Sequence, residues 1–205
     1  ASCTCAASMT SAGLVFAMLL SQSAVADFGT ERVKAAENTA KWVDTEYVVN
    51  GDFESSINED GSITGWTKST GSGLFVTKDE WAVNNTTQFT KIKDITGDNS
   101  LYQTIKNVEP GTYRISIDQD GQKDVKSGLY VKYLEQAKEL PATTDWDNWE
   151  TVTTDEFTIE AVQDVDICIG GDVTNGYWGD IDNIKLQKLY EKESDDTDSS
   201  EENQK

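Results

Sequence analysis

Short stretches of alternating apolar and polar residues, separated by turn residues, fill the chain from about residue 42 to residue 190. The clearest are Thr112–Asp118 and Gly128–Leu134. Such a period of two predicts strands with one buried face and one solvated face, and no stretch predicts a long helix. About nine or ten short strands with regular turns predict an all-β fold, a β-sandwich. The predicted inward residues are Tyr113, Ile115 and Ile117 in the first stretch and Leu129, Val131 and Tyr133 in the second.

The charge balance excludes several classes of function. The chain has 17 basic and 37 acidic residues, a formal net charge of −20, and no histidine. Nucleic acids and anionic membrane surfaces attract basic proteins, so we expect neither a nucleic-acid partner nor membrane insertion. The absence of histidine excludes a Ser-His-Asp or Cys-His catalytic pair and histidine-bound zinc. The surplus of carboxylates suits a hard cation such as calcium.

The segment Gly176–Leu186 combines a glycine-flanked loop with the last predicted strand. Ile184 and Leu186 alternate with polar residues, and Asp182 has the same parity, so we expect its carboxylate to enter the core side and to need a partner. Just before the strand, the loop can present an aromatic plane to solvent. A final strand preceded by a buried core tryptophan is an equally open interpretation.

The ends of the chain differ in composition from its middle. Residues 1–29 contain a short apolar run and a small-x-small pattern before Asp27, which predicts a signal segment and a secreted or cell-surface protein. A disordered N-terminal extension is the alternative. We expect residues 30–44 to be a linker, 45–190 to be the β-sandwich, and 191–205 to be a disordered acidic tail or linker.

Several short motifs occur in a familiar order. They are Asn50–Glu54 (Asn-Gly-Asp-Phe-Glu), Gly65-Trp66, Tyr102–Ile105 (Tyr-Gln-Thr-Ile), Pro110–Tyr113 (Pro-Gly-Thr-Tyr) and Trp178–Ile184 (Trp-Gly-Asp-Ile-Asp-Asn-Ile). Together they resemble the galactose-binding-like jelly-roll carbohydrate-binding modules. They look most like those attached to secreted arabinogalactan endo-β-1,4-galactanases, including carbohydrate-binding module family 61. The resemblance covers most of residues 47–188 and implies a jelly roll that binds β-1,4-galactan or a related plant polysaccharide for an attached glycoside hydrolase.

Aromatic residues in polar or glycine-rich loops are the candidates for holding a sugar, because a ring can stack on the C–H face of a galactose unit. Polar residues near them are candidates for contacting the hydroxyl groups. We assign Trp66 and Trp149 to the core instead. The candidate rings are Trp178, Tyr177, Trp81 and Trp146, and the candidate polar groups are Asp180, Gln119, Asn84 and Asn85.

The resemblance also implies a structural calcium ion near the first and last strands. Carried over to this sequence, its side-chain ligands are Glu54 and Asp182, with Asp52 or Asn50 nearby and backbone carbonyls completing the shell. A plain hydrogen bond from the neighbouring backbone to Asp182 is the alternative.

Two other functions remain in view. A glycosidase needs two carboxylates across the scissile bond, but no motif singles out such a pair here, so we expect a binding module without catalysis of its own. The alternative is an extracellular cell-surface interaction or adhesion domain with a protein partner, since a fold does not fix a function. In either case we expect a monomer.

Overall fold

The computed structural model describes residues 40–55, 62–68, 74–78, 88–93, 99–171 and 177–190. Within these ranges the regular elements are strands, and none of the described segments is a helix of the length and apolar character that a bilayer span requires. The expected signal segment and acidic tail lie outside the described residues, as do Trp81, Asn84 and Asn85.

One sheet is organised around two long antiparallel strands, β6 (Gly111–Gly121) and β12 (Trp178–Tyr190). On one side of this pair, β9 and β10 hydrogen-bond to β6; on the other side, β1 and β4 hydrogen-bond to β12, and β3 follows β4. We call this the β6–β12 sheet. Its shorter strands are β1 (Lys41–Asp44), β3 (Leu74–Lys78), β4 (Gln88–Lys93), β9 (Glu150–Thr153) and β10 (Phe157–Ile159).

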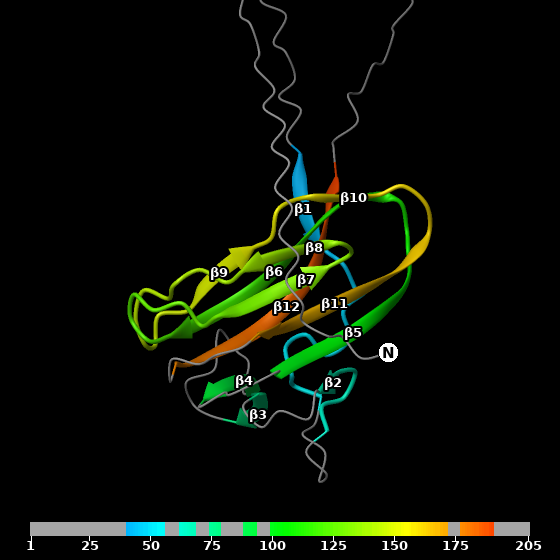
Figure 1. Ribbon diagram of the computed structural model, residues 1–205. Coiled ribbons are helices and arrows are strands. Elements are labelled where there is room, and N and C mark those ends of the chain that lie inside the picture. The colour runs from blue at the N-terminus through cyan, green and yellow to red at the C-terminus, as the bar shows by residue number, and fades with distance from the viewer. Residues whose placement is uncertain are drawn as a thin grey trace, which may run out of the picture.

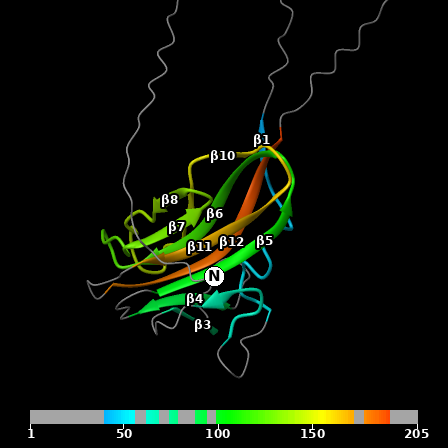
Figure 2. The ribbon, with the colours of Figure 1, turned by 45° about the vertical axis from the view of Figure 1, so that its right-hand side comes forward.

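The second sheet has the strand order β2-β5-β11-β7-β8 and is called the β5–β11 sheet. It packs against the β6–β12 sheet, and both are visibly curled (Figures 1 and 2). The predicted all-β fold, a β-sandwich of the jelly-roll type, is therefore confirmed. The strands of this sheet are β2 (Thr67–Lys68), β5 (Asn99–Val108), β7 (Leu129–Tyr133), β8 (Gln136–Glu139) and β11 (Gln163–Gly171).

The core between the sheets is built from the residues that the alternation predicts. Both predicted inward sets, on β6 and on β7, are buried. Tyr133 lies 4.8 Å from Phe157, ring centroid to ring centroid, which connects the two sheets. Trp66 is buried against Phe53, as expected for a core tryptophan, whereas Trp149 is only half-buried.

The sheet begins earlier in the chain than the sequence suggests. Strand β1 pairs with the end of β12, with Lys41 opposite Tyr190, although residues 30–44 were expected to be a linker. A four-residue strand with one apolar pair gives little alternation, so its pairing is not visible in the sequence. The first and last described strands consequently leave the domain side by side (Figure 1).

A β-bulge in β12 corrects the predicted orientation of Asp182. Asp182 pairs with Asp118, but Lys185 pairs with Ser116, so β12 has one extra residue here, and Asn183 has a φ of 48°. The bulge lets Ile184 return to the core side, whereas the register puts Asp182 on the opposite face. The prediction that Asp182 shares the core side with Ile184 is therefore wrong. The carboxylate is nevertheless fully buried, and its Oδ1 accepts the N–H of Asn183 at 2.7 Å.

Candidate functional site

Two tryptophans meet at one end of the β6–β12 sheet, on the face that points away from the core. Trp178 opens β12 and is 40% exposed, and Trp146 is half-buried in the loop between β8 and β9. Their ring centroids are 5.0 Å apart and the rings are inclined at 66°, an edge-to-face arrangement. The pair forms a partly exposed corner, which we call the Trp146–Trp178 corner.

One hydrogen bond joins the loop that carries Trp146 to the sheet, and a second lies within the loop. The N–H of Asp147 donates to Oδ2 of Asp120 on β6 at 3.2 Å, and the amide of Asn148 donates to the hydroxyl of Thr144 at 2.5 Å. Asp147 itself has a φ of 59°, which turns the chain sharply at this point. These hydrogen bonds fix the backbone on either side of Trp146, and its ring packs against Trp178.

Carboxylates lie beneath this corner. Asp180 and Asp120 are direct neighbours across β12 and β6, and each is only 1% exposed. On the other side of Asp180, β4 places Lys91 opposite it in the register. A buried carboxylate is stable only where polar or charged groups surround it. Asp120 therefore acts here as an anchor for the tryptophan loop, and Asp180, at 1% exposed, does not reach the surface where we expected it to contact a sugar.

Tyr177 lies on the opposite side of the strand from Trp178. It is 1% exposed, and its hydroxyl lies 3.4 Å from that of Thr143. Two glycines make room for its ring, because a Cβ on Gly121 would approach the Tyr177 hydroxyl to 2.3 Å and one on Gly179 would approach it to 2.6 Å. Tyr177 is therefore a core residue, and its predicted place in a solvent-facing platform is corrected.

The environment of Tyr177 also fixes its protonation state. Burial raises the pKa of its hydroxyl, the nearby charges of Asp120 and Asp180 act in the same direction, and the hydrogen bond with Thr143 opposes them. The group consequently remains a neutral phenol at physiological pH and serves as a buried hydrogen-bonding group.

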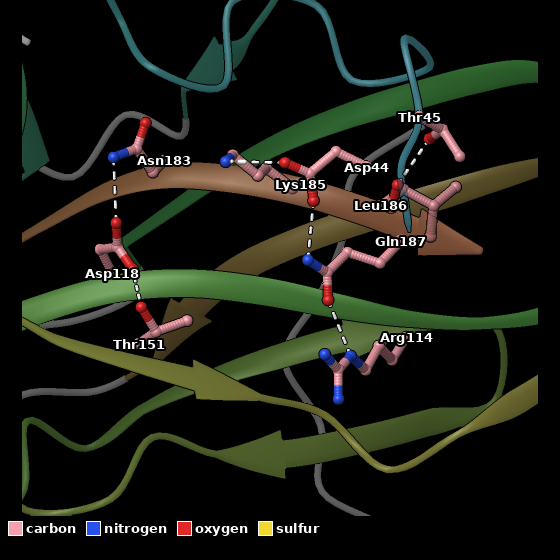
Figure 3. A network of polar contacts seen from close by, with 9 residues as sticks. All are labelled: Asp44, Thr45, Arg114, Asp118, Thr151, Asn183, Lys185, Leu186 and Gln187. Atoms are coloured by element: carbon pink, nitrogen blue, oxygen red, sulfur yellow. Dashed lines mark hydrogen bonds and ion pairs between the residues drawn. The ribbon is translucent and has the colours of Figure 1, made fainter. Parts of the chain in front are cut away.

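A polar strip continues from the corner along the outer face of β12 and β6. Asp118 accepts hydrogen bonds from the hydroxyl of Thr151 at 2.5 Å and from the amide of Asn183 at 2.9 Å (Figure 3). Each of these side chains comes from a different strand, β6, β9 or β12. The strip therefore offers a row of donors and acceptors whose orientations are fixed in advance.

The far end of the strip is a second hydrogen-bonded group. Asp44 forms an ion pair with Lys185 at 2.9 Å and accepts the amide of Gln187 at 2.7 Å, and Gln187 accepts Nε of Arg114 at 2.7 Å (Figure 3). The hydrogen bond from Lys185 lowers the pKa of Asp44. The Arg114 guanidinium lies 4.4 Å from the ring centroid of Trp42, so the strip ends, as it begins, at a tryptophan.

The predicted ligand residues divide into three groups. Trp178 and Trp146 are brought together at the surface, as expected for a platform. Tyr177, Asp180 and Gln119 are buried, and the Gln119 amide donates to the carbonyl of Pro141 at 3.2 Å. Since Gln119 points into the core, its expected contact with a ligand hydroxyl is also corrected. The remaining predicted residues, Trp81, Asn84 and Asn85, lie outside the described ranges.

The loop predicted to hold calcium is braced against β12. The carbonyl of Gly51 accepts the N–H of Ile184 at 2.9 Å, close in sequence to Asp182. Two of the predicted ligands already support the loop itself: Oδ1 of Asn50 accepts the N–H of Ser55, and Oδ1 of Asp52 accepts that of Glu54.

The fit of these residues to calcium rests on few side chains. The described residues contain no group of three or more acidic, cysteine or histidine side chains arranged to hold a metal ion. Calcium would therefore depend on Glu54 and Asp182 together with backbone carbonyls, which is chemically sufficient because only some of its six to eight oxygen ligands need to be carboxylates.

Sequence reasoning missed the polar strip. Its residues include Asp118, Thr151 and Asn183. Asp118 and Thr151 belong to no recognisable motif, and Asn183 lies within the Trp178–Ile184 motif but was not among the candidate site residues. The alternation on β6 does put Asp118 on the outer face, which is a usable signal. The contribution of Asn183 depends on the bulge and that of Thr151 on the pairing of β9 with β6, neither of which is visible in the sequence.

No family model matches this sequence. No curated protein matches it either. Solved structures do resemble the fold. A family 61 carbohydrate-binding module in complex with β-1,4-galactotriose has a TM-score of 0.53 and 21% identity, and the match covers 71% of this chain and 98% of that chain.

Two further matches are enzymes. An apo cyclase from Fischerella sp. has a TM-score of 0.54 and 14% identity over 76% of this chain and 98% of that chain. An arabinose-bound family 51 α-L-arabinofuranosidase has a TM-score of 0.51 and 14% identity over 70% of this chain, but only 26% of that chain is covered. At such identities these matches establish that the chain has the fold of carbohydrate-binding modules, which proteins with other functions share.

Proposed function

We propose that this chain is a non-catalytic carbohydrate-binding module that holds a sugar ring in the Trp146–Trp178 corner. The observation that carries the proposal is an indole, 40% exposed, that a second indole contacts from the side at a centroid distance of 5.0 Å. An exposed aromatic face is an apolar surface of the size and flatness of a pyranose C–H face. Because Trp146 restricts the motion of Trp178, little side-chain entropy is lost when a sugar stacks on the ring.

The polar strip supplies the second part of the site. A sugar chain seated on Trp178 and lying along β12 would pass Asn183, Asp118 and Thr151, whose side chains are already hydrogen-bonded to one another. Pre-ordered donors and acceptors favour a ligand with many hydroxyl groups, because few of them need to reorient on binding. An extended polysaccharide fits this arrangement better than a free monosaccharide does.

The ligand we propose is β-1,4-galactan or a related plant polysaccharide. Two observations support it: the order of the sequence motifs, and the shared fold with a module solved with β-1,4-galactotriose. In this proposal the protein is secreted, and the domain keeps a linked hydrolase of the arabinogalactan endo-β-1,4-galactanase type on its substrate. Tethering would raise the effective concentration of the enzyme at the polysaccharide even if the affinity of a single site is modest.

Affinity electrophoresis and calorimetry with galactan, xylan and a β-glucan test the function and its specificity together. We expect binding to galactan and no release of reducing ends from it. Binding to xylan or β-glucan but not to galactan would contradict the proposed specificity and still support carbohydrate binding. The absence of binding to all three would refute the carbohydrate role, and hydrolysis by the purified chain would refute the non-catalytic role.

We also propose that a structural calcium ion, held by Glu54 and Asp182 with backbone carbonyls, joins the first loop to β12. Support comes from the donor chemistry and from the hydrogen bond between Gly51 and Ile184 that brings this loop to the strand. A bound ion would stabilise the native state by mass action, by about 2.7 kcal/mol at a calcium concentration one hundred times the Kd.

Thermal unfolding with calcium and with a chelator tests the metal proposal. We expect a higher Tm with calcium in the wild type, and no calcium-dependent change in Asp182→Asn. An equal Tm of the wild type in both solutions would exclude a calcium ion that stabilises this fold.

A further inference from the structure

A cavity of about 260 Å³ opens at the edge of the sandwich, between strands that belong to different sheets. On one side lies β8, which pairs with β7, and on the other side lies β9, which pairs with β6. The cavity leads from this edge into the space between the sheets. It is therefore a slot in the side of the core and lies apart from the Trp146–Trp178 corner.

The walls of the slot are mostly aliphatic. Its inner part is formed by the fully buried residues Ile115, Ile117, Val131 and Leu140, and the less buried Pro141 and Val152 lie towards the opening. The polar part of the lining consists of Thr153, Thr154, Lys138 and Glu139. Such a surface favours apolar groups and offers little to a sugar.

The charges at the opening are compensated. Lys138 on β8 forms an ion pair with Asp155, which follows β9, at 2.9 Å, so this pair bridges the two edges of the slot. Glu139, also at the opening, pairs with Lys126 at 2.5 Å. Because each charge has its counter-ion within the protein, the opening gives no net attraction to a charged ligand, and the methylene groups of Lys138 extend the apolar wall.

We propose that this slot binds a small neutral apolar molecule, of the size of one or two fused rings. A cavity of about 150 Å³ with apolar walls is sufficient to bind benzene, and drug-sized ligands occupy pockets of about 300 Å³ or more. The volume of about 260 Å³ lies between these values and therefore matches a bicyclic ring system.

The slot and the sugar site use opposite faces of the same strands. Ile117 and its register partner Val152 face the slot, whereas the next pair, Asp118 and Thr151, belongs to the polar strip. A substitution in the slot can therefore be made without altering the side chains proposed to contact a polysaccharide, and this inference does not depend on the proposed function.

The test titrates indole, a neutral bicyclic molecule, into the whole chain and detects binding by ¹H–¹⁵N NMR. We expect saturable shifts of the backbone amides of Ile117, Val131 and Val152, and unchanged amides at Trp178 and Asn183. Indole-3-carboxylate has the same rings and a negative charge, and we expect it to bind at least about tenfold more weakly. The absence of saturable shifts, or shifts centred on Trp178, would refute the slot as a ligand site.

Three variants locate the binding. Val152→Phe fills the opening and should weaken indole binding at least about tenfold, because the ring occupies the volume of the ligand. Val162→Phe adds the same ring at a valine that is 53% exposed and remote from the slot, and it should bind as the wild type does. Val152→Ala enlarges the slot and should stay within about threefold of the wild-type affinity, since it leaves the other walls in place.

The affinities of the variants and the positions of the shifted amides together test the proposal. Unchanged indole binding by folded Val152→Phe would overturn it, as would equal weakening by Val162→Phe. If Val152→Phe does not fold, the wild-type amide shifts and the affinity of Val152→Ala test the proposal instead. Shifts along the slot together with retained indole binding by Val152→Ala would support it, and any other combination would refute it.

Discussion

Replacing Trp178 by alanine removes the exposed face on which the proposed sugar stacks. A tryptophan side chain has an area of up to about 250 Å², and the 40% exposure of Trp178 leaves about 100 Å² for a ligand to cover. At about 25 cal/mol per Å², full coverage contributes about 2.5 kcal/mol, and coverage of one face about half of that. Since about 1.4 kcal/mol corresponds to a factor of ten, Trp178→Ala should weaken binding between about 8-fold and about 60-fold.

Calorimetric titration with a soluble galactan oligosaccharide measures this change. The matched control is Tyr190→Ala, which removes another exposed aromatic residue, 51% exposed, from the far end of the same strand. The control should bind as the wild type does. Wild-type affinity in Trp178→Ala, or the same loss in Tyr190→Ala, would show that the Trp146–Trp178 corner does not hold the sugar.

Three further predictions concern stability. Gly179→Ala puts a Cβ 2.6 Å from the carbonyl oxygen of Asp120, so we expect a loss of about 1–3 kcal/mol in urea denaturation, and a wild-type midpoint would contradict the close packing. Burial raises the pKa of Tyr113 to about 12, so its contribution to stability should persist below about pH 10 and fall as the pH rises towards 12; a phenolate absorbance titration that finds it ionising near pH 10 would contradict this. Lys185 lowers the pKa of Asp44, so the stabilisation by this pair should be present above about pH 3.8 and lost as the pH falls through the lower folded-state pKa. Urea denaturation at pH 7 and pH 3 should show that Asp44→Asn removes this pH dependence, which is worth less than about 1 kcal/mol because the pair is exposed.

The fold was predictable because its main signal is local. The alternation in β6 and β7 assigns each residue to a face from its own neighbours, and the structure buries Ile117 and Val131 as that rule requires. This inference needs no knowledge of which strands pair. Alternation also puts Tyr177 and Trp178 on opposite faces, but it does not tell which of the two rings faces the core, and the structure buries Tyr177 and exposes Trp178.

The site was predictable only in part, because it depends on pairings between distant segments. Trp146 meets Trp178 because the N–H of Asp147 is held by Asp120, 27 residues earlier in the chain. A single extra residue at the bulge in β12 reverses the expected face of Asp182, and nothing in the local sequence distinguishes a bulge from regular alternation. Errors of this kind affect polar residues most, because an apolar residue can be assigned to the core face of the sheet from its type alone, whereas a buried carboxylate cannot.

The neighbouring residues Tyr177 and Trp178 show how one strand can combine core packing with a proposed binding surface. Successive side chains point to opposite faces, so the first ring is enclosed at 1% exposure and the second is open at 40%. The glycines that admit the Tyr177 ring belong to the same strands that carry the Trp146–Trp178 corner, and packing on one face therefore fixes the backbone from which the other face projects. Because the outer face contributes little to the hydrophobic core, its polar residues can change while the sandwich is retained, and a fold of this kind does not fix a function.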